Sequence, residues 1–185
     1  MLRKPLSISR ILASEPEQLG SESLDDAKFV IQDVGNWIKN ADTKSTVIAA
    51  ATGVVATAVA SKIDIVYSAL NNTDFHCKWA LLVLAALSFV ALVATGYYLN
   101  RALSPRTHQE GAVNRFAWPS LANGKGVPRE FSWSAANREA WDQAERLAGI
   151  AKLKFENLRT AMRWFGLGFV SSLVMIIVAT WNSKP

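Results

Sequence analysis

The chain has 185 residues, a formal net charge of +5 and a single cysteine, Cys77. One cysteine excludes an intramolecular disulfide, and with the neighbouring His76 it offers two metal ligands at most, fewer than a zinc site needs. Half of the residues are hydrophobic, and they are concentrated in three long blocks. Blocks of this length favour membrane spans over an ordinary water-soluble domain.

The first part of the chain, residues 1–20, holds two prolines and no clear hydrophobic period, so we expect a flexible leader. Its basic residues are followed by acidic residues rather than by an apolar core, which argues against a secretory signal. A cytoplasmic helix over 21–44 is predicted to begin near Ser21 or Ser23, because either hydroxyl can cap a helix N-terminus.

A row of apolar residues runs along 21–44 at the spacing 3-4-3-4-3, which is typical of a helix with one buried face. The row consists of Leu24, Ala27, Ile31, Val34, Ile38 and Ala41. The chain then enters 45–61, which is 17 residues long without a charge. No proline separates the two segments, so we expect one continuous helix that begins in water and ends in lipid.

Two further blocks complete the membrane part. Residues 79–99 are 21 residues without a charge, and 164–181 form a third uncharged block. Both lengths suit helices that cross a bilayer core of about 30 Å. The short connection 62–78 is polar in its middle and is predicted to be an external loop that makes the first two spans an antiparallel hairpin.

Between the second and third spans lie a predicted cytoplasmic loop, 100–133, and a predicted cytoplasmic helix, 134–163. The loop is punctuated by glycine and proline yet rich in large aromatics, so we expect it to pack onto the rest of the protein. The helix carries a second row at helical spacing: Trp141, Ala144, Ala148, Ala151, Phe155, Leu158 and Met162. This row could pair with the first row within one chain, or the rows could form a homodimer.

The sequence therefore predicts an all-α, multi-pass membrane protein with three transmembrane helices, two of which extend into a cytoplasmic helical stalk. Lysine and arginine are numerous before the first span and over 100–163 and scarce over 62–78. By the positive-inside rule the N-terminus is cytoplasmic and the C-terminus external.

Two charged residues stand at the entrance to the first span, Asp42 and Lys44. A carboxylate one turn from the bilayer is costly unless it is used, so Asp42 could belong to a ligand-binding or gating contact. Alternatively, Asp42 could pair with Lys39, and Lys44 could reach the headgroups as an anchor.

Cations and aromatics occur close together in sequence after the second span, and they include Arg115, Trp118, Arg129 and Arg138. Cations can hold a phosphate and aromatic rings can hold a base, so these residues could form a ligand-binding site. The alternative is a basic, aromatic belt at the membrane surface. No nucleophile elbow, metal cluster or pair of catalytic carboxylates is recognisable, so we do not expect an enzyme and expect no metal or other cofactor.

The entrance to the first span, Trp37-Ile-Lys-Asn-Ala-Asp-Thr-Lys44, resembles that of the small membrane effectors of Pycsar, a bacterial antiphage system built around a pyrimidine cyclase. Residues 143–161 before the last span, and the order of spans and loop, are similar to that family as well. The resemblance covers about 25–181 and adds Trp37 to the candidate ligand-binding or gating residues.

The resemblance implies a partner cyclase that makes cyclic UMP or cyclic CMP on infection. The effector, a homo-oligomer in the bacterial inner membrane, would respond by impairing that membrane, which is abortive infection. We expect no nucleic-acid partner, because the basic residues are interleaved with acidic ones. A membrane scaffold or adaptor that holds a partner protein through its cytoplasmic helices is the alternative function.

Overall fold

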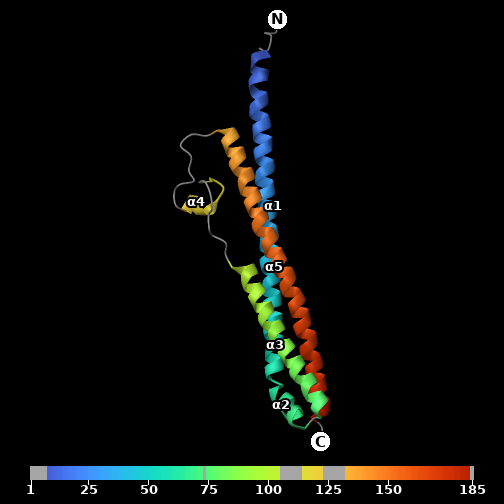
Figure 1. Cartoon of the computed structure of the whole chain (residues 1–185). Coiled ribbons are helices and arrows are strands. Elements are labelled where there is room, and N and C mark those ends of the chain that lie inside the picture. The colour runs from blue at the N-terminus through green and yellow to red at the C-terminus, as the bar shows by residue number, and fades with distance from the viewer. Residues whose placement is uncertain (1–7, 73, 105–113, 123–131, 184–185) are drawn as a thin grey trace. The chain divides into compact units, whose positions relative to one another are not determined.

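The computed structural model describes residues 8–72, 74–104, 114–122 and 132–183 (Figure 1). It contains five helices in these residues and no strand, so the all-α prediction is confirmed for the part described. The helices are α1 (Ile8–Ala60), α2 (Ile63–Asn72), α3 (Phe75–Leu103), α4 (Trp118–Ala122) and α5 (Trp133–Asn182).

The chain divides into two compact units. Unit 1 consists of Met1–Ile38 and Pro105–Ala151, and unit 2 consists of Lys39–Ser104 and Lys152–Pro185. Because α1 and α5 each pass from unit 1 into unit 2 without interruption, the predicted joining of each polar helix to its apolar span is confirmed.

Unit 1 is held by the first parts of α1 and α5, which lie side by side and run in the same direction (Figure 1). Leu24 and Ala27 of α1 pack against Ala136 and Ala140 of α5, with Phe116 packed on the same cluster. Alanine has no side chain beyond its β-carbon, so the two helices can approach closely here. The apolar row predicted on α1 is confirmed: all six of its residues are buried or half-buried in their own units.

Unit 2 is a bundle of three long helical segments with the short α2 at one end. Leu99 of α3 packs with Ala41 and Leu158 of the other two helices, which run in the opposite direction to α3. At the far end of the bundle Leu81 and Met175 form a second cluster, which α2 covers with Ala69.

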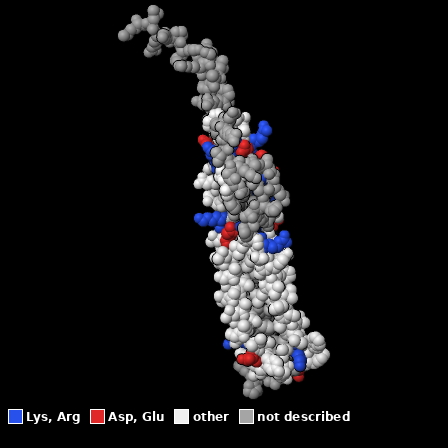
Figure 2. All heavy atoms as spheres, turned by 90° about the vertical axis from the view of Figure 1, so that its left-hand side faces the viewer, with Lys and Arg blue, Asp and Glu red and all other residues white. Residues whose placement is uncertain are grey.

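Three helices are long and apolar enough to cross a membrane, by length and composition. Large apolar side chains point outwards from unit 2, as with Val54 at 70% and Phe89 at 71% exposure. Figure 2 shows, on the face that it presents, a broad band without charged side chains between two charged levels. An apolar outer surface of this kind suits contact with lipid.

The interior of unit 2 is built from small residues. The Ser88 hydroxyl donates a hydrogen bond to the Ser171 hydroxyl at 2.9 Å, which links α3 to α5. A β-carbon added at Gly168 would lie 3.2 Å from the Ala91 β-carbon, so α3 and α5 are in close contact at this level. Threonines of the first span donate to the backbone carbonyl four residues earlier: Thr46, Thr52 and Thr57.

Several predicted boundaries differ from the structure. The first helix begins at Ile8 rather than near Ser21, so Ser23 lies inside α1 and its hydroxyl bonds to Asn137 instead of capping a terminus. The predicted leader 1–20 is thus helical from Ile8, and the part before it lies outside the described residues. The predicted loop 62–78 contains α2, because Ile65, Val66, Ala69 and Leu70 give it an apolar face that packs on the bundle.

The row predicted on the fifth helix is only half right. Ala144, Ala151 and Leu158 are buried, but Trp141 and Met162 are 43% and 55% exposed. Ala148 is exposed as well, while Phe155 is half-buried. The buried face includes a second series one residue earlier than the predicted one: Ala140, Leu147 (half-buried), Lys154 and Ala161.

Candidate functional sites: a buried ion pair and an anchored loop

The first site is an ion pair between the two long helices of unit 2. The Lys154 ammonium on α5 donates to an Asp42 carboxylate oxygen on α1 at 2.5 Å. The Lys154 side chain is 8% exposed and the Asp42 side chain 41% exposed. Asp42 therefore pairs with a cation on another helix, and not with Lys39 as the alternative interpretation supposed.

Local structure explains why a lysine is buried here. Lys154 lies one turn after Ala151 and one turn before Leu158, on the face of α5 that packs into the bundle. Its neighbour Phe155 packs on the cluster of Ala41, Leu99 and Leu158, which fills the bundle at this level. A cation in apolar surroundings needs a partner to offset its lost hydration, and Asp42 is that partner.

The other residues predicted at this entrance are not part of the ion pair. Lys44 is exposed, and its position fits either an anchor at a headgroup or a contact for a ligand. Trp37 is 54% exposed, and its indole N–H donates to Asp33 one turn earlier at 3.2 Å. Trp37 belongs to unit 1 and Asp42 to unit 2.

The second site lies in unit 1, where Arg115 and Glu139 form a bidentate pair. The guanidinium donates from Nε to Oε2 and from Nη2 to Oε1, both at 3.0 Å. The backbone N–H of Arg115 donates to Oε2 as well, at 3.0 Å. Chiefly through these side-chain bonds, Arg115 holds the pKa of the Glu139 carboxyl below its ordinary value, and Glu139 raises the pKa of Arg115.

Neighbouring hydrogen bonds fix the segment 114–122 to α5. The side-chain Nδ2 of Asn114 donates to the Glu139 backbone carbonyl at 2.6 Å, and its Oδ1 accepts from the Phe116 backbone N–H at 2.8 Å. The buried Ser120 hydroxyl accepts from the Asn114 N–H at 3.2 Å. Together with Phe116 in the core, these bonds make the segment an anchored part of unit 1, as predicted for a loop that packs.

Only two members of the predicted cation–aromatic slot, Arg115 and Arg138, have described side chains. Arg115 is engaged by Glu139, whereas Arg138, one residue earlier on α5, is exposed. Trp118 begins α4 but its side chain lies outside the description, and Arg129 lies outside the described residues altogether. The sequence did not single out Glu139 or Lys154, the two residues that pair with predicted ones.

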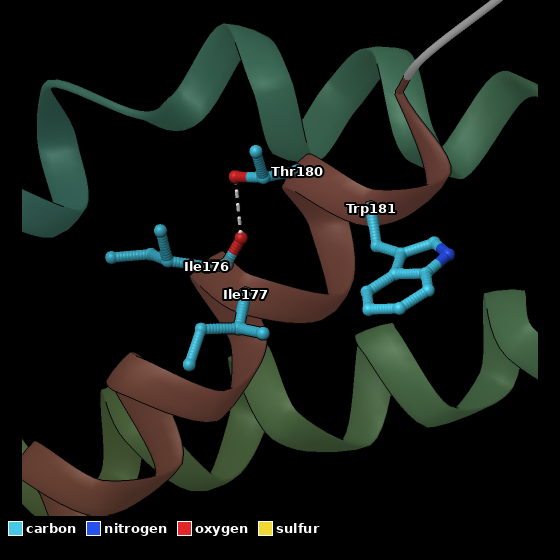
Figure 3. Close-up of a pocket in the computed structure, with 4 residues that line it drawn as sticks. All are labelled: Ile176, Ile177, Thr180 and Trp181. Atoms are coloured by element: carbon cyan, nitrogen blue, oxygen red, sulfur yellow. Dashed lines mark hydrogen bonds between the residues drawn. The ribbon is translucent and has the colours of Figure 1, made fainter.

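A pocket of about 550 Å³ lies on the last turns of α5 in unit 2 (Figure 3). Ile176, Ile177, Thr180 and Trp181 line it, and the Thr180 hydroxyl is bonded to the Ile176 carbonyl at 2.7 Å. Its lining has no charge that could hold a phosphate, and Trp181 is 80% exposed. The pocket therefore suits an apolar occupant rather than a nucleotide.

The described side chains include no cluster of three or more His, Cys, Asp or Glu residues that could hold a metal ion. What the two sites can do is hold elements together electrostatically. One ties α1 to α5 beside the membrane spans, and the other ties the segment 114–122 to α5.

The chain was compared with known proteins. A search of curated proteins found no match, and neither did a search of solved structures. A family model described as PycTM, Pycsar effector protein domain, matches residues 26–181. This match includes the ion pairs of the two sites and nearly all of the three candidate spans, and the chain belongs to this family of Pycsar effector proteins.

Proposed function

We propose that this protein is the membrane effector of a Pycsar-like antiphage system. In this proposal cyclic UMP or cyclic CMP, made by a partner pyrimidine cyclase, activates it to impair the inner membrane and cause abortive infection. The observation that carries the proposal is the family match over 26–181, which covers nearly all of the three candidate membrane spans.

The continuity of the long helices supports a gating mechanism. In this proposal unit 1 receives the ligand, and α1 and α5 carry the change into unit 2 because each is one unbroken helix. The resting state must be closed, or the cell would die uninfected. Moving such an equilibrium from 1:99 to 99:1 needs a ligand preference of about 5.5 kcal/mol for the open state.

The orientation and the oligomer are part of the same proposal. The excess of lysine and arginine over 1–44 and 100–163 supports a cytoplasmic unit 1, by the positive-inside rule. Only 6% of the most apolar stretch of α1 is buried within one chain. This leaves a face of α1 for lipid or for a second copy of the protein. A homo-oligomer would let several ligands share the energy of opening.

Candidate ligand residues differ in how accessible they are. Trp37, Lys44 and Arg138 are exposed and can meet a ligand directly. Arg115 would bind a phosphate only by exchanging Glu139 for it, since Glu139 occupies its guanidinium. Asp42 would act through its ion pair rather than by touching an anion, and Trp118 and Arg129 stay candidates from the sequence.

Leakage of a trapped dye from liposomes tests the proposal. The purified full chain is reconstituted into vesicles of bacterial phospholipid, and cyclic UMP, cyclic CMP, cyclic AMP and cyclic GMP are titrated separately. We expect leakage to rise with a cyclic pyrimidine nucleotide and not with the purine nucleotides. Tight vesicles with every nucleotide, together with an unchanged potential in cells that produce the cyclic pyrimidines, would instead favour the scaffold function.

A further inference from the structure

The ion pair of unit 2 is unequal in burial, and this inequality says which partner depends on the other. Lys154 is 8% exposed, so its charge has lost most of its water, whereas Asp42 keeps 41% of its side-chain surface. Removing Asp42 would leave a buried cation without compensation. Removing Lys154 would leave a carboxylate that water can still reach.

The pair also fits only one register of the two helices. The carboxylate nearest to Asp42 on α1 is Asp33, more than two helical turns away, and α1 carries no carboxylate after Asp42. On α5 the buried residues one turn from Lys154 are Ala151 and Leu158, neither of which carries a charge. A slip of one turn in either direction would therefore separate the charges and bring no other α1 carboxylate to Lys154.

The pair lies where a change of register would matter most. Asp42 is three residues before the uncharged segment 45–61, and Ala41 beside it packs with Leu99 and Leu158 in the bundle. All of these residues belong to unit 2. The pair therefore joins α1 to α5 directly at the entrance to the spans.

We infer that the Asp42–Lys154 ion pair is the latch of the resting state. It holds α1 and α5 in the register in which unit 2 is closed, and activation requires its separation. This inference rests on the proposed function, because leakage presupposes that the protein impairs the membrane. It does not depend on the identity of the signal, since its main consequence is that the vesicles leak without any nucleotide once the latch is removed.

A purely structural ion pair would behave differently, and a double variant separates the two roles. A buried pair that only contributes to packing can usually be replaced by uncharged residues of similar size without loss. The variant D42N–K154M keeps the volumes and removes both charges. If the pair is a latch, this variant is folded but no longer held in the closed register.

The experiment measures dye leakage without nucleotide from vesicles that contain equal amounts of each variant. For D42N–K154M we expect leakage at least about tenfold above the unmodified protein, with unchanged helix content and insertion. Of the single variants, D42N should leak more than K154M, because D42N leaves the buried Lys154 charge unpaired whereas K154M leaves the more exposed Asp42. The reversed pair D42K–K154D should be close to the unmodified protein, because opposite charges meet again.

The matched control is D25N, which breaks the exposed pair Lys28–Asp25 at 2.9 Å on the surface of unit 1 and should leave leakage unchanged. A folded D42N–K154M variant that is as tight as the unmodified protein overturns the inference. So does a reversed pair that leaks as much as the double variant. If no variant responds to cyclic pyrimidines but D42N–K154M leaks, the proposed signal is wrong and the latch stands.

Discussion

Replacing Glu139 by glutamine tests how the segment 114–122 is held on α5. The carboxylate accepts three hydrogen bonds from Arg115, each at 3.0 Å, and the two side chains are 29% and 14% exposed. Exposed ion pairs contribute about 0–1 kcal/mol, and breaking a buried one costs about 3–5 kcal/mol. For this half-covered pair, with one glutamine oxygen left as an acceptor, we expect a loss of about 2 kcal/mol.

The same contact has a pH dependence whose sign follows from the pKa of Glu139. Because Arg115 lowers this pKa in the folded state, the contribution is fully present above the unfolded value of about 4.3. It is lost as the pH falls through the lowered folded value, since the carboxyl must then be protonated. Glutamine does not titrate, so the variant lacks this acid-sensitive part of the stability.

Hydrogen exchange reads out the effect locally. The Arg115 amide donates to Glu139 and the Phe116 amide to Asn114, so both report the opening of the anchored segment. A loss of about 2 kcal/mol corresponds to exchange about thirtyfold faster at both amides. The control is Glu145→Gln, an exposed position on the same helix. Equal exchange in the two variants would refute the anchoring role of the pair.

Three further predictions concern packing and topology. Gly168→Ile should destabilise unit 2 by about 1–3 kcal/mol in thermal unfolding, whereas Gly166→Ile, with no atom within 4 Å of an added β-carbon, should be nearly neutral. Ala144→Lys should lower stability by several kcal/mol, because Ala144 is 3% exposed, and Ala148→Lys should be tolerated; equal effects would contradict the observed face of α5. A reporter fused after Pro185 should be active only when it functions outside the cytoplasm, and cytoplasmic activity would reverse the topology.

Much of the fold follows from the sequence because the signals are long. Three uncharged blocks and two proline-free junctions are enough to predict three candidate spans and two helices that continue past them. The row from Leu24 to Ala41 is also predictable, since its apolar residues recur at helical spacing. Short elements such as α2 are harder to predict, because ten residues within a polar connection give a weak periodic signal.

The face of α5 was harder to predict for a physical reason. The predicted and the observed face share Ala144, Ala151 and Leu158, which are seven residues apart, and differ by one residue at the positions between them. The predicted series took the large residues Trp141 and Met162 into the core. The observed helix contacts use Ala140 and Ala161 instead, because small residues allow close approach, so size does not identify the buried face.

The same error hid the ion pair. A lysine is assigned to the outer face of a helix by default, because lysines are almost never fully buried unless they are paired. Moving the series one residue earlier replaces Phe155 by Lys154 on the inner face and brings it to Asp42. The usable signal was the unexplained carboxylate of Asp42, which needed a cation on a neighbouring helix.

Alanine-rich helix contacts explain why polar pairs have such weight in this molecule. A pair such as Ala27 and Ala140 permits close approach but resists sliding little, because a β-carbon makes only a shallow ridge. Register must then come from groups that are satisfied at one position only. Unit 1 has such a contact in Ser23–Asn137, at 3.0 Å, and unit 2 has Ser88–Ser171. In these contacts the groups are neutral, and separating them costs less free energy than separating a buried ion pair. Separating Asp42 from Lys154 would leave a buried charge unpaired. The charged pair is therefore the contact whose separation a signal must drive.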